Sequence, residues 1–473
     1  MSLPAAQRKR LGAWYTPLSL VEHVVGRTVG PVERGQRVCV LDPACGDGRF
    51  LHAAARWIRA QGGVPVLTGV DVDEAALALV DTREDAVELI RGDALHLDFG
   101  ERSFDVVVGN PPFLSQLSAT TVRAAGSRFG GGPYADAAAD FVALAVRAAR
   151  PRSGRVGLVL PLSLLTARDA GPIRAEVSRV ADPSWFWWSE APVFEAMVRT
   201  CAIGLRRHDG NPRTAPVERA AGPDFSHTRS VSRPPSPRNA CGNESWGWLL
   251  ADELGVPPLP SLHTDGTLAE RALVTANFRD QYYGLVGAVS DEGDGPPLVT
   301  TGLIDPARCH WGRRPTRFAK QKFEAPRVDR AQLVPFMQRW ADRCLVPKVL
   351  VATQTQILEA VADATGSWLP AVPVIRLVPA DPETLWSLAA VLTSPVASAL
   401  IAGESVGSGL SPRAMRVSQR TLGVLPWPGG DLHAAVAALR AGDVVGCGRN
   451  VDAAYGVDDD TLAAWWSSKL TMS

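Results

Sequence analysis

Residues 110–113 read Asn-Pro-Pro-Phe and directly follow the apolar run Phe-Asp-Val-Val-Val at 104–108 and one glycine. Such a run predicts a buried strand, so Asn110 is expected at the carboxyl end of that strand. Each proline fixes its own φ and keeps the preceding residue extended, so this segment cannot continue as a helix. We therefore expect the Asn110 side-chain oxygen and the Pro111 carbonyl to be rigid acceptors, with Phe113 offering a face on which a base can stack.

Two fixed acceptors suit an amino group attached to an aromatic ring, whose nitrogen is a poor nucleophile because its lone pair is delocalised. Acceptors that bind both N–H hydrogens can pull this nitrogen toward tetrahedral geometry and make the lone pair available for attack. A rigid strand-to-loop corner is the alternative explanation. It accounts for the prolines but not for the asparagine and the aromatic residue beside them.

A glycine-rich turn, DPACGDGRFL at 42–51, follows an earlier apolar run. Gly46 and Gly48 permit positive φ and close approach of the backbone to a ligand, and the helix that follows can attract an anionic ligand end. A tight strand-to-helix turn would explain the glycines alone. Leu51 stands where a dinucleotide-binding turn has its third glycine, so a nicotinamide cofactor is disfavoured.

Acidic residues end the next two apolar runs, Asp71 in GVDVDEAAL and Asp93 in RGDAL. At the carboxyl edge of a parallel sheet, Asp71 could accept hydrogen bonds from ribose hydroxyls and Asp93 from the exocyclic amine of an adenine. Either residue alone could instead be a helix N-cap. Several polar residues at successive strand ends favour one shared ligand crevice.

Seven β-rich apolar runs alternate with helical patterns between residues 37 and 207, which predicts a seven-stranded, doubly wound α/β sheet. The runs are RVCVL, VLTGV, AVELI, FDVVV, RVGLVL, SWFWW and TCAIGL. Composition then shifts to Pro, Gly, Ser, Asn and Arg, which indicates a linker. We expect a catalytic domain at 1–210, a linker at 211–260 and a separate α+β domain at 261–473.

The chain has 473 residues, 46% of them hydrophobic, and 49 basic residues balance 49 acidic ones. Attraction to a polyanion must therefore come from a local patch. Seven scattered cysteines without metal-ligand spacing indicate a reducing cytosol and no structural zinc. The N-terminus lacks an apolar run of signal-peptide length, and we interpret the uncharged stretch 385–403 as a buried helix of small residues, so a cytoplasmic location without membrane contact is expected.

Taken together, these motifs resemble the gamma-class adenine-N6 DNA methyltransferases of the Taq type. The resemblance includes WYTPLSLVEHVV at 14–25, similar to that family's cofactor lid, and the looser VFEAMVRTCAIGL at 193–205. It implies cofactor contacts from Tyr15, Thr16, Pro17, Asp42, Pro43, Ala44, Gly46, Gly48, Asp71, Asp93, Asn110 and Phe141. It implies a catalytic motif of Asn110, Pro111, Pro112 and Phe113. Phe113 and Phe194 would stack on the target base, although core packing is an equal alternative for Phe194.

The resemblance further implies S-adenosyl-L-methionine as cofactor and direct methyl transfer to N6 of an adenine flipped out of double-stranded DNA. Neither a metal nor a covalent nucleophile is needed, and Cys45 is expected to be a packing residue. A cognate restriction endonuclease or another defence-system protein is a possible partner. We expect the chain to be a monomer.

Residues 308–348 contain 11 basic and three acidic residues, a local balance of +8, interleaved with aromatic side chains. A solvated basic surface is the ordinary explanation of such a segment. Beside a DNA-modifying domain, it favours a target recognition domain that contacts phosphates. The expected DNA-binding residues are Arg313, Arg314, Arg317, Lys320 and Lys322.

Two other functions are compatible with parts of this pattern. A methyltransferase acting on RNA or on a protein glutamine amide would share the Asn-Pro-Pro-Phe site, but such enzymes usually carry their extra domain before the catalytic one. A non-catalytic DNA-specificity subunit would keep the fold without needing intact DPACGDG, Asp71 and Asn110. DNA adenine methylation is therefore the favoured hypothesis.

Overall fold

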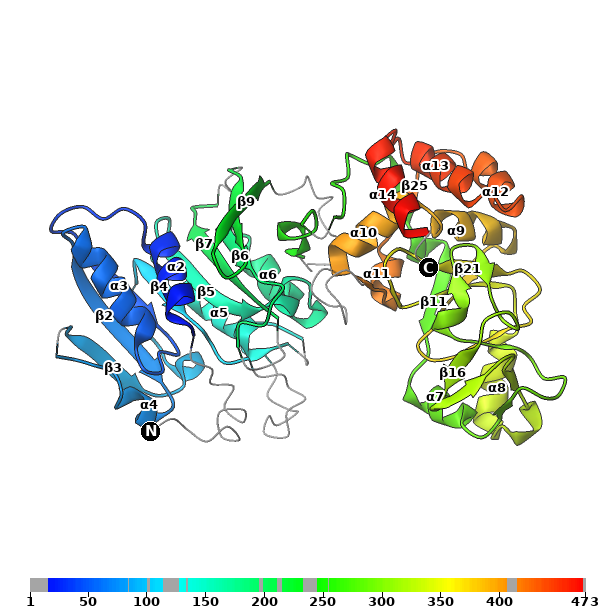
Figure 1. The fold of residues 1–473 in the computed structure, drawn as a ribbon, viewed down its shortest axis with the longest axis horizontal. Helices are drawn as coiled ribbons and strands as arrows, with labels where there is room; N and C mark the ends of the chain where they lie inside the picture. Colours follow the sequence, from blue (N-terminus) through cyan, green and yellow to red (C-terminus); the bar gives the residue numbers. More distant parts are fainter. Residues whose placement is uncertain are drawn as a thin grey trace. The chain divides into compact units, whose positions relative to one another are not determined.

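The structure is a computed structural model that describes residues 16–83, 85–99, 103–113, 127–132, 135–194, 199–210, 215–232, 245–253, 255–405 and 415–470. The chain divides into two compact units, Met1–Leu249 and Leu250–Ser473. The first unit contains the strands predicted between residues 37 and 207, and the second contains the basic segment 308–348 (Figure 1).

The first unit is built on a mixed sheet in the order β3-β2-β1-β4-β5-β7-β6-β8-β9. Strands β3 to β5 are parallel, whereas β7 runs antiparallel to both of its neighbours. The strands are β1 (Arg37–Asp42), β2 (Val64–Asp71), β3 (Val87–Arg91), β4 (Val106–Gly109), β5 (Arg155–Pro161), β6 (Ala181–Trp188), β7 (Thr200–Arg207), β8 (Val217–Ala221) and β9 (Ser226–Val231). All seven predicted strands are present.

The expectation of a seven-stranded sheet is wrong, because β8 and β9 extend the sheet to nine strands. Both lie within 211–260, the range expected to be a linker, and β8 pairs with β6 in parallel. Their sequences, VERAA and SHTRSV, contain few β-branched apolar residues. Strand β9 is an edge strand with mostly exposed side chains, so it lacks the apolar run that predicts a buried strand.

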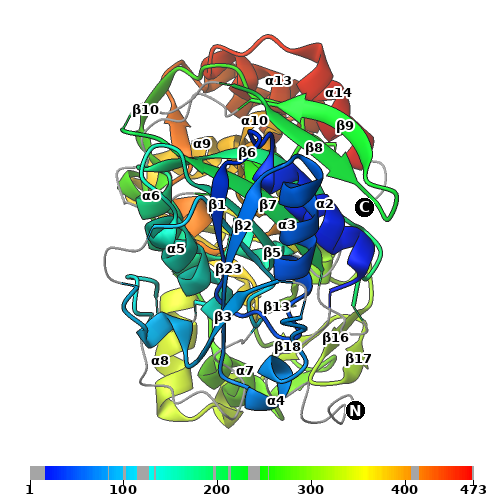
Figure 2. The same ribbon diagram turned by 90° about the vertical axis from the view of Figure 1, so that its left-hand side faces the viewer.

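Helices cover both faces of the sheet (Figure 2). Helices α2 (Leu18–Val29) and α3 (Arg49–Ala60) pack on one face, and α5 (Ala137–Ala148) and α6 (Gly171–Val177) lie on the other. The core beneath α2 and α3 contains Val40, Val106, Val108 and Val159, all at most 2% exposed. These are alternate residues on β1, β4 and β5, because successive side chains of a strand point to opposite faces.

Strand β1 lies between β2 and β4 in the sheet. Strands β2 and β3 therefore extend the sheet on one side of β1, and β4 and β5 extend it on the other side. This is the topological switch point of an open parallel sheet, where ligands bind outside the carboxyl ends of the strands. Asp42 ends β1, Asp71 ends β2, and Asn110 follows β4. The topology therefore brings the predicted polar residues to one edge.

The second unit contains a four-stranded antiparallel sheet in the order β11-β23-β19-β21. The strands are β11 (Ala272–Ala276), β23 (Ile375–Pro379), β19 (Lys348–Val351) and β21 (Ala360–Asp363), and the helices beside them are α9 (Leu385–Val391), α10 (Pro395–Ser405), α12 (His433–Arg440), α13 (Val444–Ala454) and α14 (Asp460–Leu470). One large apolar core joins the sheet to these helices. The tail helix α14 buries Trp466 in this core.

The segment 385–403 is buried, as expected, but it forms two helices instead of one. Thr393 and Ser394 donate their hydroxyls to the carbonyls of Ala389 and Val391. Pro395 follows, and a proline disfavours helical backbone in the residue before it. Within the described ranges no single helix has the length and apolarity for a membrane crossing, although the bent pair Pro382–Val391 and Pro395–Ser405, at 67°, together meets those criteria.

Helices α7 (Arg279–Leu285) and α8 (Pro335–Cys344) and the hairpin of β16 (Thr316–Phe318) and β17 (Gln321–Phe323) share a second core in this unit (Figure 1). The remaining short elements are α4 (Glu74–Leu77), α11 (Gln419–Gly423), β10 (Thr264–Thr267), β12 (Val289–Ser290), β13 (Leu298–Val299), β14 (Ile304–Asp305), β15 (Arg308–Cys309), β18 (Arg327–Val328), β20 (Gln354–Thr355), β22 (Leu369–Pro370), β24 (Met415–Arg416) and β25 (Pro426–Pro428).

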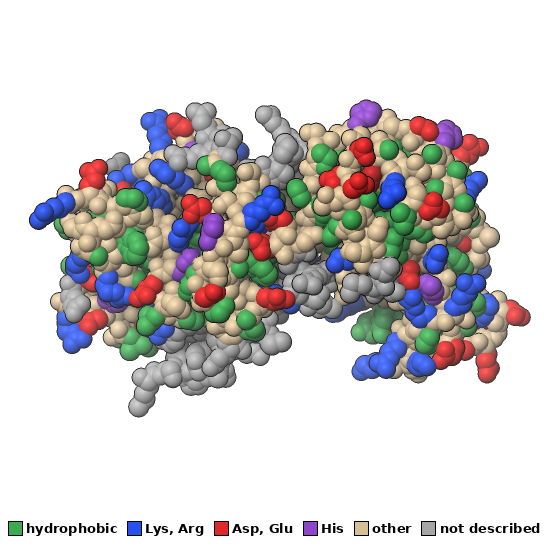
Figure 3. Space-filling model, turned by 45° about the horizontal axis from the view of Figure 1, so that its top comes forward, with side chains coloured by type: hydrophobic (Ala, Val, Ile, Leu, Met, Phe, Trp, Pro, Cys, Tyr) green, Lys and Arg blue, Asp and Glu red, His purple; other side chains and the backbone are tan. Residues whose placement is uncertain are grey.

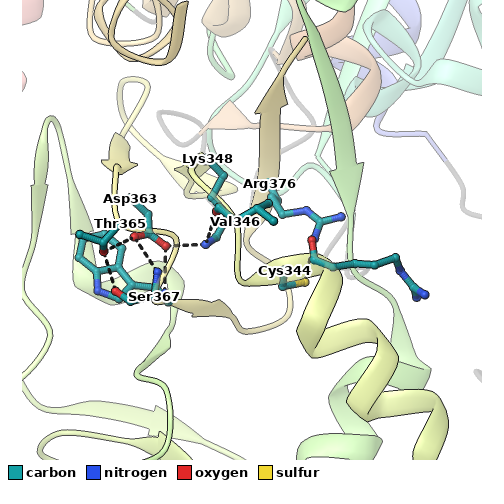
Figure 4. A network of polar contacts seen from close by, with 9 residues as sticks. Cys344, Val346, Lys348, Asp363, Thr365, Ser367 and Arg376 are labelled. Atoms are coloured by element: carbon teal, nitrogen blue, oxygen red, sulfur yellow. Dashed lines mark hydrogen bonds and ion pairs between the residues drawn. The ribbon is translucent and has the colours of Figure 1, made fainter. Parts of the chain in front are cut away.

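A buried ion pair ties β19 to β21 in the second unit (Figure 4). Lys348 Nζ lies 2.5 Å from Asp363 Oδ2, and the two side chains are 0% and 1% exposed. Asp363 also accepts hydrogen bonds from the backbone N–H groups of Ser367 and Trp368 and from the Thr365 hydroxyl. Lys348 was counted in the basic segment 308–348, but its ammonium is inside the protein and is not part of a surface patch.

Candidate active site

Asn110 stands at the carboxyl end of β4, as predicted, and the backbone there passes very close to the end of β1. A Cβ atom at Gly109 would lie 2.6 Å from Asp42 Oδ1, so a larger residue could not occupy this position without a shift. The two prolines follow Asn110 without forming a helix. Glycine before the motif and proline within it thus fix the asparagine beside the Asp42 carboxylate.

The Asn110 amide is held by a residue from the segment before α2. Its Nδ2 donates to Thr16 Oγ1 at 3.0 Å, and Thr16 is 4% exposed. The Thr16 carbonyl in turn accepts from an Arg49 guanidinium nitrogen at 3.0 Å. With its NH₂ group bound to Thr16, the amide directs its oxygen away from that hydroxyl, which is the orientation that the predicted acceptor role requires.

Asp71 braces the glycine turn. Its Oδ2 accepts from the Gly46 N–H at 2.8 Å, and its Oδ1 accepts from the Asp73 N–H at 2.9 Å. Gly48 has φ 82° and precedes α3 without any side-chain cap, so the first N–H groups of that helix have no capping side chain. The turn and the helix start therefore combine a carboxylate with a partial positive charge.

Asp42 is a buried carboxyl group in the site. The side chain is 1% exposed; its Oδ1 accepts from the Ala44 N–H, and its Oδ2 has no hydrogen-bond partner among the described residues. Burial raises the pKa of Asp42 well above its usual value, and the nearby Asp71 and Asp47 carboxylates raise it further. A cationic ligand group would compensate this buried carboxylate.

Cys45 lies in the same turn, with its side chain 5% exposed. Burial raises the pKa of its thiol, and the Asp42 and Asp71 carboxylates act in the same direction. The thiol is therefore protonated at neutral pH and a poor nucleophile. Its environment agrees with the predicted packing role.

Asp93 follows β3 and caps a short helical turn, Ala94–His96. Its Oδ1 accepts from the Leu95 N–H at 3.0 Å, and its Oδ2 lies 2.7 Å from His96 Nδ1. The helix-cap explanation that the sequence left open is thus present for Asp93. It does not hold for Asp71, because Asp73 caps the following helix α4 instead.

Phe113 and Phe194 meet in space although they are far apart in the sequence. Their ring centroids are 6.3 Å apart and the rings are nearly perpendicular, at 80°. Phe194 is 8% exposed, and Phe113 is half-buried against the same core. Phe141 is buried on α5. Tyr15, the first residue of the expected lid core, lies outside the described residues.

Two contacts of the site were not predicted from the sequence. Thr16 was expected to touch a cofactor, but here its hydroxyl holds the Asn110 amide. Arg49 was not singled out at all, yet it binds both the Thr16 carbonyl and the Asp47 carboxylate. An arginine immediately after the glycine turn, in DPACGDGR, is the only sequence signal that could have pointed to this role.

The expected DNA-binding cations belong to the second unit and differ in their surroundings. Arg313, Arg317 and Lys320 are exposed. Arg314 instead donates to both carboxylate oxygens of Asp305, at 3.0 and 2.9 Å, and to the Gly302 carbonyl. Lys322 pairs with Glu324 on the surface. Blue basic side chains and red acidic ones are interspersed on the lower part of this unit in Figure 3.

Comparison with known proteins connects the first unit to one family. Residues 2–178 match the N-6 DNA Methylase family. The Type II methyltransferase M.TthHB8I of Thermus thermophilus is 39% identical over 110 residues, which cover 23% of this chain and 23% of that protein. The matched segment thus spans about a quarter of the curated relative.

Solved structures resemble a larger part of the chain. The Type IIL restriction-modification enzyme MmeI in complex with DNA matches with a TM-score of 0.50 and 11% identity, covering 99% of this chain and 76% of that one. The type IIG restriction endonuclease BpuSI matches with a TM-score of 0.40 and 12% identity over 98% and 64%. The first of these likenesses concerns the fold alone. The similarity in sequence to the N-6 DNA methylase family thus concerns residues 2–178 of this chain.

Proposed function

We propose that this protein is a site-specific DNA methyltransferase that transfers a methyl group from S-adenosyl-L-methionine to N6 of adenine in double-stranded DNA. The observation that carries the proposal is the Asn110 amide, fixed by Thr16 beside the buried Asp42 at the switch point of the sheet. A restriction-modification or phage-defence role, with a cognate endonuclease or defence protein as partner, fits such an enzyme.

The donor set fits S-adenosyl-L-methionine, which carries an amino-acid end with an ammonium and a carboxylate, a sulfonium and an adenosine. Asp42, buried with an unsatisfied oxygen, suits a cationic group. The uncapped start of α3 suits a carboxylate, and Asp71 is placed to accept from ribose hydroxyls. Both carboxylate oxygens of Asp93 already have partners in the turn that it caps. To bind the adenine amine, Asp93 would therefore have to use a remaining lone pair of one of these oxygens. When bound, the cofactor supplies a methyl group already activated by the sulfonium charge.

Because the methyl donor is already activated, the residues of this chain need only position the adenine amine. The Asn110 oxygen and the Pro111 carbonyl accept the two N6 hydrogens, which localises the nitrogen lone pair for in-line attack. Such fixed acceptors cost no reorganisation during the reaction. Thr16 keeps the amide in the required orientation.

A stacked duplex denies access to N6, so the adenine has to be flipped out at a cost of a few kcal/mol. Phe113 and Phe194 line the same place, and stacking of a base on an aromatic side chain contributes about 1–3 kcal/mol. The perpendicular rings cannot sandwich a base in their present arrangement. We therefore propose that Phe113 provides the stacking face and that Phe194 contacts the edge of the base or reorients.

Expression in a bacterial host without DNA methylation, followed by modification-sensitive genome sequencing, tests the proposed function. N6-methyladenine confined to one sequence motif is the expected result. The Asn110→Ala variant, expressed at the same level, is the negative control. A genome without new methylation, from cells that contain folded protein binding S-adenosyl-L-methionine, would contradict the proposal.

Cofactor binding is expected to release a proton. The raised pKa of Asp42 keeps part of this carboxyl protonated in the free protein, whereas a bound cationic group favours the ionised form. Affinity should therefore increase as the pH rises through the raised pKa of Asp42, because the ionised carboxylate is the form that binds a cation. Calorimetric titrations in two buffers with different ionisation enthalpies measure the released proton. Asp42→Asn should abolish both effects, and equal heats in the two buffers for wild type would contradict the prediction.

Thr16→Val is expected to lower the methylation rate constant by about tenfold, because it leaves the Asn110 NH₂ group without its hydroxyl partner. Thr16→Ser keeps the hydroxyl and should restore most of the rate. Single-turnover rates at saturating cofactor separate this effect from a change in cofactor affinity. If valine and serine variants lose rate equally, Thr16 does not act through its hydroxyl.

A further inference from the structure

We propose that the β16–β17 hairpin enters the DNA major groove and that Arg317 binds a guanine there. This inference rests on the proposed function, since it requires a DNA substrate. It goes further by separating the cations that could read bases from those that serve the fold of the second unit. Three observations on the hairpin carry it: the arrangement of its charges, the backbone of its tip and its attachment to the protein.

The outer face of the hairpin carries two like charges directly opposite each other. Arg317 on β16 pairs in register with Lys322 on β17, and both side chains are exposed. Residues in this relation have Cβ atoms about 5 Å apart, and like charges there are unfavourable. Lys322 has Glu324 as a partner. Arg317 has no ion-pair or hydrogen-bond partner within the described ranges, so its charge is not used by the fold.

The tip of the hairpin is formed by Ala319 and Lys320 in the left-handed region, with φ 48° and 67°. A two-residue turn of this kind normally contains Asn or Gly, because residues with a Cβ atom are strained there. Lys320 is exposed, and across the described part of the chain it forms no ion pair. The backbone of the tip is therefore locally strained. Lys320 is a third cation beside Arg317 and Lys322, and residues 316–323 include no acidic residue.

The hairpin is firmly attached by its inner face. Phe318 and Phe323 are buried in the core that includes α7 and α8. The ring centroids of Phe318 and Tyr282 are 5.2 Å apart. Thr316 Oγ1 lies 2.5 Å from Thr300 Oγ1. Just after the hairpin, the N–H groups of Glu324 and Ala325 donate to the Asp291 carboxylate. A fixed two-stranded ribbon is therefore presented outward with cations on its outer face.

A polyanion would relieve the charge repulsion on the hairpin, since phosphates compensate the opposed cations Arg317 and Lys322. The major groove, about 12 Å wide, admits a two-stranded ribbon, and arginine most often donates two hydrogen bonds to guanine O6 and N7 there. Arg314 differs from Arg317 because its guanidinium is bound to Asp305. Local conflicts without internal compensation are typical of functional sites.

Selection of bound sequences from a pool of randomised duplexes tests the inference without requiring methylation. Wild-type protein should enrich a motif that contains guanine, and Arg317→Gln should lose the preference at one guanine by about 10- to 100-fold. Replacing that guanine by 7-deazaguanine, which lacks N7, should weaken wild-type binding but not binding by the variant. Inosine, which lacks the minor-groove amine, should leave both unchanged.

The single variant Arg449→Gln, on α13, removes one exposed arginine elsewhere in this unit and should keep the wild-type motif. Because Arg317 is exposed, its replacement should not disturb the fold. Equal thermal unfolding temperatures of wild type and variants would show that all of them are folded. An unchanged motif in Arg317→Gln overturns the inference, as does a loss of salt dependence without any loss of sequence preference. Selective DNA binding without methylation would support the hairpin while contradicting the proposed function.

Discussion

Replacing Asn110 by alanine is expected to lower the rate of DNA methylation by about a thousandfold, while binding of S-adenosyl-L-methionine persists. Alanine removes the side-chain acceptor for the adenine amine but leaves the Pro111 carbonyl in place. Loss of one preorganised hydrogen-bonding group at a reacting centre typically costs about 100- to 1000-fold in rate. Asp42 and Asp71, which are proposed to hold the cofactor, are unchanged in this variant.

Single-turnover rates on a duplex with the recognised sequence, together with calorimetric cofactor binding, measure the two effects separately. Asn110→Asp is the matched variant, because it keeps an acceptor oxygen but cannot donate to Thr16 and adds a charge beside Asp42. It should be slower than wild type and faster than alanine. Wild-type rates in the alanine variant would contradict the acceptor mechanism, and lost cofactor binding would indicate that Asn110 mainly supports the cofactor site.

The sheet of the first unit was largely predictable because its central strands are buried and apolar. Strands β1, β4 and β5 read as continuous apolar runs, and the rule that ligands bind at carboxyl ends then predicted Asp71, Asp93 and Asn110 on one edge. Strands β8 and β9 were missed for the opposite reason. Strand β9 is the edge strand and its side chains are mostly exposed, whereas β8 is short and includes the polar Glu218 and the buried Arg219, so neither strand reads as an apolar run.

The contacts within the site were less predictable, since they join residues far apart in the chain. Thr16 and Asn110 are 94 positions apart, and nothing in either motif indicates which donor would hold the amide. The Asp42 carboxylate, one oxygen of which is unsatisfied, lies against the backbone of β4 at Gly109. Such features follow from packing and not from a local pattern.

Counting charges along 308–348 overstated the surface patch for a related reason. The partners of two of its cations lie outside that range: Asp305 holds Arg314, and Asp363 holds Lys348. A sequence window registers the cations but not the carboxylates that the fold brings to them. That Arg317 and Lys320 on the hairpin are exposed without an ion-pair partner among the described residues, unlike Arg314, became apparent only from the structure.

Lys348→Met is expected to have the largest effect on stability, lowering the free energy of unfolding of the second unit by about 3–5 kcal/mol. The substitution leaves the Asp363 carboxylate charged and buried without its cation, and breaking a buried pair on one side typically costs this much. Burial lowers the pKa of Lys348 while Asp363 opposes that shift, so the pair is interdependent. Urea titration followed by tryptophan fluorescence measures the change.

Adding Asp363→Asn to Lys348→Met should recover part of the loss. The asparagine carries no charge, and its side-chain oxygen can still accept from the backbone N–H groups of Ser367 or Trp368. Lys322→Met, which breaks the exposed pair with Glu324, is the control and should change stability little, because solvent screens surface ion pairs. Equal small losses for Lys348→Met and Lys322→Met would contradict the prediction. They would mean that water reaches the Asp363 carboxylate once the lysine is gone, so that the charge need not be paired within the protein.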